Sequence, residues 1–253
     1  MDIGTHTKPY IMHPRTRASA TLQLICFPYA GGGTTSYSAW LDALPDQIEV
    51  CPVKLPGRED RLFDPPHTDL EELLAALASD LESTVGQSFA FFGHSMGAMI
   101  AYELTRYLRR QDMPLPVTLL VSGHRAPHLP DRRTHISHLP NDQFITQLSH
   151  MNGTPAAVVQ HRELMEMLLP ALRADFTLCE TYTYFSEAPL ECPIAAFSGT
   201  EDYIANPEQM APWREQTSGA FRLHCFAGGH FFLHELQSQV IQMVVSELTP
   251  LIH

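Results

Sequence analysis

A serine lies at the centre of the run Gly93-His94-Ser95-Met96-Gly97, between an apolar segment that predicts a strand and an amphipathic segment that predicts a helix. This G-x-S-x-G pattern is typical of a sharp strand–turn–helix junction that lifts a serine hydroxyl clear of a sheet. Glycines suit such a turn because side chains there would collide with neighbouring backbone. The helix N-terminus also favours negative charge that develops near the hydroxyl. The pattern therefore predicts a nucleophile; the competing interpretation is a Gly-rich turn with a capping serine.

A serine nucleophile needs a base, and the base needs a carboxylate that orients it. On such a scaffold the three residues follow the chain order Ser, Asp or Glu, His. Asp202 follows the predicted strand Ile194–Gly199, and His230 follows the predicted strand Phe221–Phe226. Because loops after parallel strands meet at one edge of a sheet, we predict that both residues join Ser95.

Three other residues compete for the roles of acid and base. Glu201 precedes Asp202 directly and is an alternative acid. His224, inside a predicted strand, and His234, one helical turn beyond His230, are alternative bases. The other histidines are scattered and form no H-E-x-x-H motif, so we expect neither a metal site nor a bound cofactor.

Acyl transfer produces an oxyanion that backbone N–H groups must stabilise. We predict the N–H of Met96 as one donor, because it follows the nucleophile. The glycine-rich loop Phe27–Gly33 follows an early strand and supplies the second donor, assigned to Ala30 with Tyr29 as the alternative. This loop matches neither the P-loop motif nor a G-x-G-x-x-G fingerprint that opens a helix.

The elements that must position these residues alternate along the chain between short apolar runs and longer amphipathic ones. This alternation predicts a mainly parallel sheet that helices cover on both faces. The predicted strands are Thr21–Phe27, Ile48–Leu55, Ser88–Phe92, Val117–Ser122, Ile194–Gly199 and Phe221–Phe226. The predicted helices of this core are Leu70–Val85, Ala98–Arg110 and Leu236–Leu248.

The stretch from about 127 to 187 interrupts this alternation with helical patterns and no convincing strand. Helices are predicted from Asn141 through Leu148 and over His161–Leu169. Helical inserts of this size at a sheet edge often form lids over active sites. Four apolar side chains of the insert could line an adaptable acyl chamber, or simply pack its helices together: Met151, Met165, Met167 and Leu168.

The 253 residues suit one domain over 21–253 after a loose N-terminal tail over 1–20. The net charge of -12 argues against nucleic acid as a partner, and no apolar run reaches the roughly 18 residues of a membrane helix. The five cysteines form no C-x-x-C pair, and Cys26, Cys51 and Cys225 lie in predicted strands. We therefore expect buried, reduced thiols in a cytoplasmic protein, with a monomer as the default.

Four ordered motifs together resemble the type II thioesterases, stand-alone α/β-hydrolases that accompany nonribosomal peptide and polyketide synthases. The motifs are Phe27-Pro28-Tyr29-Ala30-Gly31-Gly32, Leu55-Pro56-Gly57-Arg58-Glu59 with Arg61, Gly93-His94-Ser95-Met96-Gly97, and Gly229-His230-Phe231-Phe232. The resemblance covers about residues 20 to 250. It implies an α/β-hydrolase fold and hydrolysis of acyl groups from the phosphopantetheine arm of carrier proteins. It also implies the triad Ser95, Asp202 and His230. The segment Gly57–Arg61 is a feature of the family to which the residues assign no catalytic role, and its arginines are interpreted as solvated or structural.

Charge suggests where such a carrier protein would dock. The segment from Thr105 to His138 contains six arginines and two acidic residues, which gives it a net charge of +4 within an acidic chain. Carrier proteins of these synthases are usually acidic, so Arg125, Arg132 and Arg133 at the start of the insert are docking candidates. A solvated charged surface without a partner is the alternative.

Other functions share parts of this pattern. A fatty-acyl chain-releasing thioesterase or a general carboxylesterase would use the same catalytic residues and differ in the insert and partner surface. An inactive carrier-protein-binding module is the alternative from another class, although the complete Ser, Asp and His set argues against it.

Overall fold

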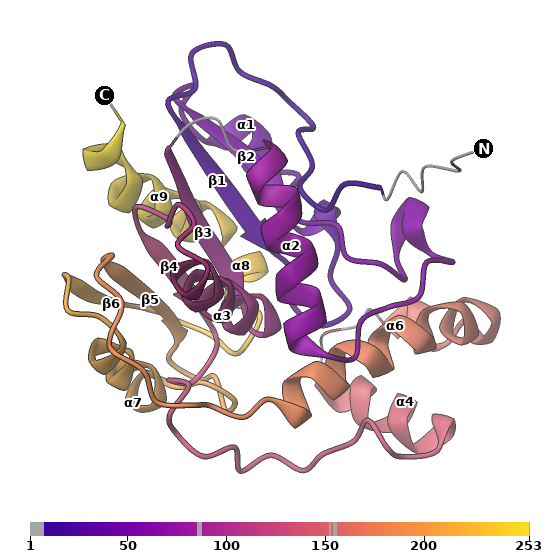
Figure 1. Cartoon of the computed structure of the whole chain (residues 1–253). Helices are drawn as coiled ribbons and strands as arrows, with labels where there is room; N and C mark the ends of the chain where they lie inside the picture. Colours follow the sequence, from indigo (N-terminus) through magenta and orange to yellow (C-terminus); the bar gives the residue numbers. More distant parts are fainter. Residues whose placement is uncertain (1–7, 85–87, 152, 154–155, 253) are drawn as a thin grey trace.

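The computed structural model describes residues 8–84, 88–151, 153 and 156–252. Six parallel strands form one central sheet in the order β2-β1-β3-β4-β5-β6 (Figure 1). The strands are β1 (Leu22–Phe27), β2 (Ile48–Pro52), β3 (Ser88–His94), β4 (Leu119–Ser122), β5 (Ile194–Gly199) and β6 (Phe221–Phe226). The register pairs Phe27 with Gly93. The loops that follow β1 and β3 therefore leave the same edge side by side.

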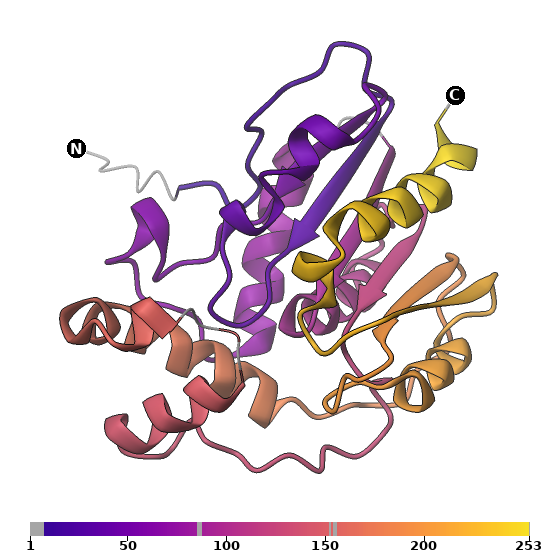
Figure 2. The ribbon, with the colours of Figure 1, turned by 180° about the vertical axis from the view of Figure 1, so that it is seen from behind.

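Helices cover both faces of the sheet because strand side chains alternate between them. On one face Ile25 and Phe27 of β1 pack in the core beneath α2 (Leu70–Thr84) and α3 (Met96–Arg110). On the other face the intervening side chains pack against α1 (Trp40–Ala43) and α9 (Gln237–Leu248). Figure 2 shows the ribbon from behind, with these two helices in front of the sheet. Shorter elements complete the core domain: α7 (Pro207–Met210), α8 (Phe232–Glu235) and the 3-10 turns η1 (Thr34–Tyr37), η2 (Glu59–Arg61), η3 (Ala211–Gln216) and η4 (Thr249–Leu251).

The predicted insert is helical where it is described. It contains α4 (Asn141–His150), α5 (Ala156–Val159) and α6 (Arg162–Thr181), and α4 and α6 lie together beside one end of the sheet (Figure 1). A small core of its own holds the helices together: Ile136, Phe144, Leu148, Met165, Leu169 and Leu172. The sequence predicted that the second helix ends at Leu169, but α6 continues through Pro170. Apolar side chains on the same face, including Leu172 and Leu178, are buried and offset the hydrogen bond that proline removes.

Two further expectations differ from the structure. The described part of the predicted loose tail is attached, because Ile11 pairs with Val53 next to β2 and its N–H donates to Asp80 on α2. Cys225 was expected to be buried but is exposed, since β6 is an edge strand with one poorly covered face, whereas Cys26 and Cys51 are buried. Among the described residues no helix is long and apolar enough to cross a membrane.

Candidate active site

Ser95 lies in the turn between β3 and α3, with backbone angles φ 55° and ψ -117°. This left-handed geometry is strained for a residue with a side chain, and such strain is common at functional sites. Neither flanking position has room for a side chain. A Cβ on Gly93 would lie 2.1 Å from the carbonyl oxygen of Gly97, and a Cβ on Gly97 would lie 2.1 Å from that of Phe27. The turn predicted from the G-x-S-x-G pattern is therefore present, and Ser95 lines a cavity.

The structure brings the three predicted residues together. His230 Nε2 lies 3.1 Å from Ser95 Oγ, and His230 Nδ1 lies 2.8 Å from Asp202 Oδ2. The other carboxylate oxygen of Asp202 accepts hydrogen bonds from the N–H groups of Ile204 and Ala205 at 2.8 and 3.0 Å. Asp202 and His230 are both buried. With the carboxylate accepting from Nδ1–H, Nε2 is left free to accept the serine proton.

The competing residues lie elsewhere. The Glu201 side chain is exposed, and it is Asp202 that bonds the imidazole. His224 Nε2 pairs with Glu247 at 2.8 Å on the far side of β6. His234 Nε2 is hydrogen-bonded to the hydroxyl of Tyr29 at 3.0 Å. Of the three histidines, only His230 contacts the serine.

The loop after β1 lies against the serine turn. Its hydrogen bonds account for two N–H groups: Gly31 N–H donates to Asp175, and Gly32 N–H donates to the carbonyl of Tyr29. Within the described ranges no acceptor binds the N–H groups of Tyr29, Ala30 or Met96. Tyr29 and Ala30 line the same cavity as Ser95. Both predicted donors and the Tyr29 alternative thus remain open to an oxyanion.

A cavity of about 310 Å³ lies over these residues, between the sheet edge and the insert. Its floor includes Ser95 and His230, and its walls include Met151 of the insert and Phe176 of α6. Of the four residues predicted to line an acyl chamber only Met151 does so. Met165 is buried within the insert, Met167 is half exposed, and Leu168 lines a separate hollow.

A thioesterase domain model matches residues 22–248, nearly the whole chain. The chain belongs to the thioesterase family. It is similar to the linear gramicidin dehydrogenase LgrE of Brevibacillus parabrevis, with 44% identity covering 96% of this chain and 95% of that protein. It is 41% identical to the gramicidin S biosynthesis protein GrsT of Aneurinibacillus migulanus, covering 98% and 97%. The structure of the type II thioesterase BorB, from the borrelidin biosynthetic cluster, superposes with a TM-score of 0.87 at 37% identity, covering 96% and 99%.

A buried ion pair in the thioesterase gives Arg58 of the Gly57–Arg61 motif a structural role. Arg58 donates to Asp175 on α6 at 2.7 Å and to the carbonyl of Gly32 at 2.7 Å. Asp175 also accepts the N–H of Gly31 at 2.8 Å, and both charged side chains are almost fully buried. The pair therefore joins the oxyanion loop, the loop after β2 and the insert. Sequence reasoning missed it because its members lie over 100 residues apart.

Replacing Asp175 by alanine should destabilise the thioesterase strongly. The change leaves the Arg58 guanidinium buried without a counter-charge, which typically costs about 3–5 kcal/mol. Equilibrium unfolding in urea checks this result. Glu166→Ala is the matched control, since it removes an exposed partner of Arg162 on the same helix and should leave the unfolding midpoint unchanged. Equal midpoints for both variants would contradict the role of the buried pair.

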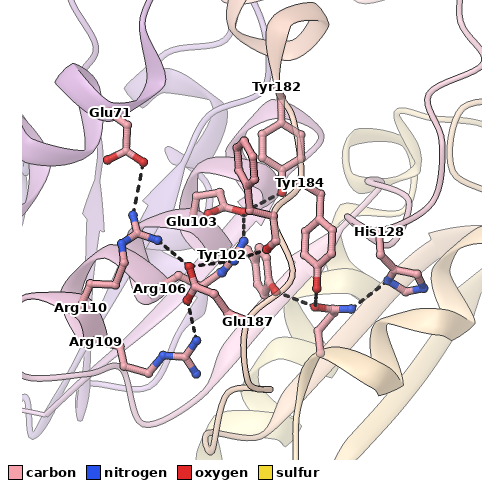
Figure 3. Close-up of polar contacts among 12 residues, drawn as sticks. Glu71, Tyr102, Glu103, Arg106, Arg109, Arg110, His128, Tyr182, Tyr184 and Glu187 are labelled. Atoms are coloured by element: carbon pink, nitrogen blue, oxygen red, sulfur yellow. Dashed lines mark hydrogen bonds and ion pairs between the residues drawn. The ribbon is translucent and has the colours of Figure 1, made fainter.

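The predicted basic patch is largely neutralised in the thioesterase. Five of its six arginines pair with carboxylates. Figure 3 shows Arg106 with Glu103 and Glu187, Arg109 with Glu187, and Arg110 with Glu71 and Glu187. The other two, Arg125 and Arg133, both pair with Asp131. The structure differs from the docking prediction at Arg125, which is buried, and at Arg133, which makes three hydrogen bonds to Asp131. Arg132 is exposed, and no carboxylate pairs with it in the part of the chain that the structure describes. Docking stays a prediction for Arg132.

Two buried histidines of the thioesterase are held neutral. Burial lowers the pKa of His94, next to the nucleophile, well below its ordinary value. Burial, together with the nearby Arg125 and Arg133, lowers the pKa of His124 to about 3. His94 is hydrogen-bonded to Ser122 through Nδ1 at 2.9 Å, and His124 Nδ1–H donates to the carbonyl of Arg125 at 2.8 Å.

These two histidines should make the thioesterase lose stability as the pH falls. In the unfolded chain they bind protons below about pH 6.5, whereas the folded chain does not, so acid favours unfolding. Each group contributes up to about 1.4 kcal/mol per pH unit below that value. Urea unfolding at pH 7.5, 6.0 and 5.0 measures the slope. His124→Asn should reduce this slope, while the exposed His150→Asn should retain the wild-type slope. A wild-type stability independent of pH over this range would refute the argument.

Proposed function

We propose that this thioesterase hydrolyses acyl and aminoacyl thioesters on the phosphopantetheine arm of carrier proteins, as a stand-alone enzyme of a nonribosomal peptide or polyketide assembly line. The observation that carries the proposal is the Ser95–His230–Asp202 hydrogen-bonded chain at the floor of the cavity. The similarity to GrsT and BorB over nearly the full chain supports the assembly-line setting.

The reaction has two halves. In the first, Ser95 Oγ attacks the thioester carbonyl while His230 Nε2 takes the hydroxyl proton. The carbon–sulfur bond then breaks, and the histidine returns the proton to the departing thiol. In the second, His230 takes a proton from water, which attacks the acyl-serine and releases a carboxylic acid and free Ser95. Asp202 holds the imidazole tautomer that both halves need, and it stabilises the imidazolium.

The tetrahedral intermediates carry negative charge on the former carbonyl oxygen. The N–H groups of Ala30 and Met96 are the donors that we assign to it, because no acceptor among the described residues binds them and both lie beside the nucleophile. Preorganised donors of this kind need no rearrangement during the reaction. The scheme requires neither a metal nor a bound cofactor.

The helical insert serves as the lid over this site. Arg132, which is exposed and lies in the sequence between the cavity-lining residues Asp131 and Arg133, is the candidate contact for an acidic carrier protein. We place the enzyme in the cytoplasm, where the synthases act, and expect a monomer. LgrE is named a dehydrogenase. This sequence lacks the G-x-G-x-x-G dinucleotide fingerprint that would favour that activity.

Intact-protein mass spectrometry of loaded carrier proteins tests the function. A carrier protein is loaded with acetyl, butyryl or aminoacyl groups, and its deacylation is followed with a simple p-nitrophenyl ester as the comparison substrate. We expect deacylation of the carrier protein to be much faster than ester cleavage. Ester cleavage without deacylation would indicate a general carboxylesterase. Neither activity would indicate an inactive binding module.

A further inference from the structure

The cavity wall contains a carboxylate, Glu180, for which the described part of the chain shows no ion pair. Glu180 lies in the last turn of α6, and its oxygens accept hydrogen bonds only from backbone, namely the N–H of Ile136 at 2.7 Å and the N–H of Ser137 at 3.1 Å. In the part of the chain that the structure describes, no ammonium, guanidinium or imidazole pairs with it. A carboxylate has acceptor capacity beyond these bonds, so Glu180 can bind another donor.

The other charges of the wall are already paired. The Arg133 guanidinium is bonded to Asp131 through two nitrogens, at 2.7 to 3.2 Å, and Arg125 lies behind the same carboxylate. Apolar and aromatic side chains form much of the remaining wall, among them Met151 and Phe176. Asp131 thus serves both arginines, whereas Glu180 acts on Arg133 only at a distance, where its charge helps to raise the pKa of that guanidinium. Glu180 is therefore the carboxylate of the wall that is free to form an ion pair with a bound cation.

The position of Glu180 on its helix strengthens its attraction for a cation. The helix α6 ends at Thr181, and the last turn of a helix presents unpaired carbonyls with partial negative charge. Phe176 lies one turn earlier on the same helix face, four residues away, and also lines the cavity. An acyl group with an ammonium would lose part of its hydration on entering the cavity, which is costly unless a counter-charge receives it.

We propose that Glu180 selects acyl groups that carry an ammonium, so that the enzyme favours aminoacyl thioesters over uncharged acyl thioesters of the same shape. The selection rests on the proposed function, because it concerns the acyl part of that substrate. Glu180 is a specificity-determining residue and takes no part in bond breaking. Glu180 also holds the segment around Ile136 by accepting its backbone N–H. The test must therefore distinguish the effect of the negative charge on the substrate from the structural effect of this hydrogen bond.

Two pairs of loaded carrier proteins measure the preference for an ammonium group. Alanyl is compared with isobutyryl and β-alanyl with butyryl, each pair differing by an ammonium in place of a methyl group. At pH 7 most of the amino groups are protonated. In at least one pair the wild-type kcat/KM should be about tenfold higher for the ammonium substrate, the size expected of a hydrogen bond between charged groups.

Glu180→Gln keeps an oxygen for the Ile136 N–H and removes the charge. It should lower the preferred pair's ratio by about tenfold, while kcat/KM for the uncharged substrates stays within about twofold of wild type. Glu166→Gln removes one charge from the same helix outside the cavity and should keep the wild-type ratio. An unchanged ratio in Glu180→Gln would overturn the proposal, as would a wild-type ratio near one in both pairs. Both outcomes leave hydrolysis of the uncharged substrates intact, and so leave the proposed function standing.

Discussion

Ser95→Ala should lower the rate of carrier-protein deacylation by roughly 10⁶-fold, the loss seen when a serine nucleophile is removed from such a triad. Alanine keeps the Cβ of serine, so the strained backbone of the turn experiences the same crowding. The change therefore removes the hydroxyl and little else. Intact-protein mass spectrometry over hours measures the residual rate, which the oxyanion donors sustain above that of water.

Thermal unfolding and chemical labelling serve as controls for this variant. The unfolding midpoint should match that of the wild type. A fluorophosphonate probe should add its mass to the wild type and leave Ser95→Ala unlabelled, because only an activated serine attacks it. If the variant retained more than about a hundredth of the wild-type rate, Ser95 would not be the nucleophile.

The serine turn and the triad could be predicted because each depends on a local pattern with a fixed place in the topology. Gly93 and Gly97 mark the tight turn by their spacing around Ser95, although the contact that requires Gly97 is with the distant carbonyl of Phe27. Asp202 and His230 each follow a strand that a clear apolar run predicts. Parallel strands then bring the loops to one edge without further information. The fold class followed from the same alternation of strands and helices.

The features that sequence reasoning missed depend on pairings between distant side chains. Nothing near Arg58 indicates that its partner is Asp175, 117 residues later. Counting charges along the chain suggested a basic patch, but acids of other elements, such as Glu187, neutralise most of it in three dimensions (Figure 3). The continuation of α6 through Pro170 likewise depends on burial of the following turns, which local propensity does not include.

Asp202→Asn should lower kcat by roughly 10⁴-fold, although the two side chains have nearly the same shape. Asp202 Oδ1 accepts two backbone N–H groups, from Ile204 and Ala205, so the amide oxygen of asparagine must take that place. The amide nitrogen then faces His230 Nδ1 and donates to it. The imidazole is forced to carry its proton on Nε2, where it cannot accept the proton of Ser95.

Glu201→Gln is the matched control for this prediction, because it makes the same chemical change one residue earlier. The Glu201 side chain is exposed and is not the partner of the imidazole, so steady-state deacylation should stay close to that of the wild type. Equal losses in both variants would indicate a general effect of negative charge near the site rather than control of the tautomer. A loss in Glu201→Gln alone would move the acid of the triad to Glu201, and the hydrogen bond between Asp202 and His230 would then be structural.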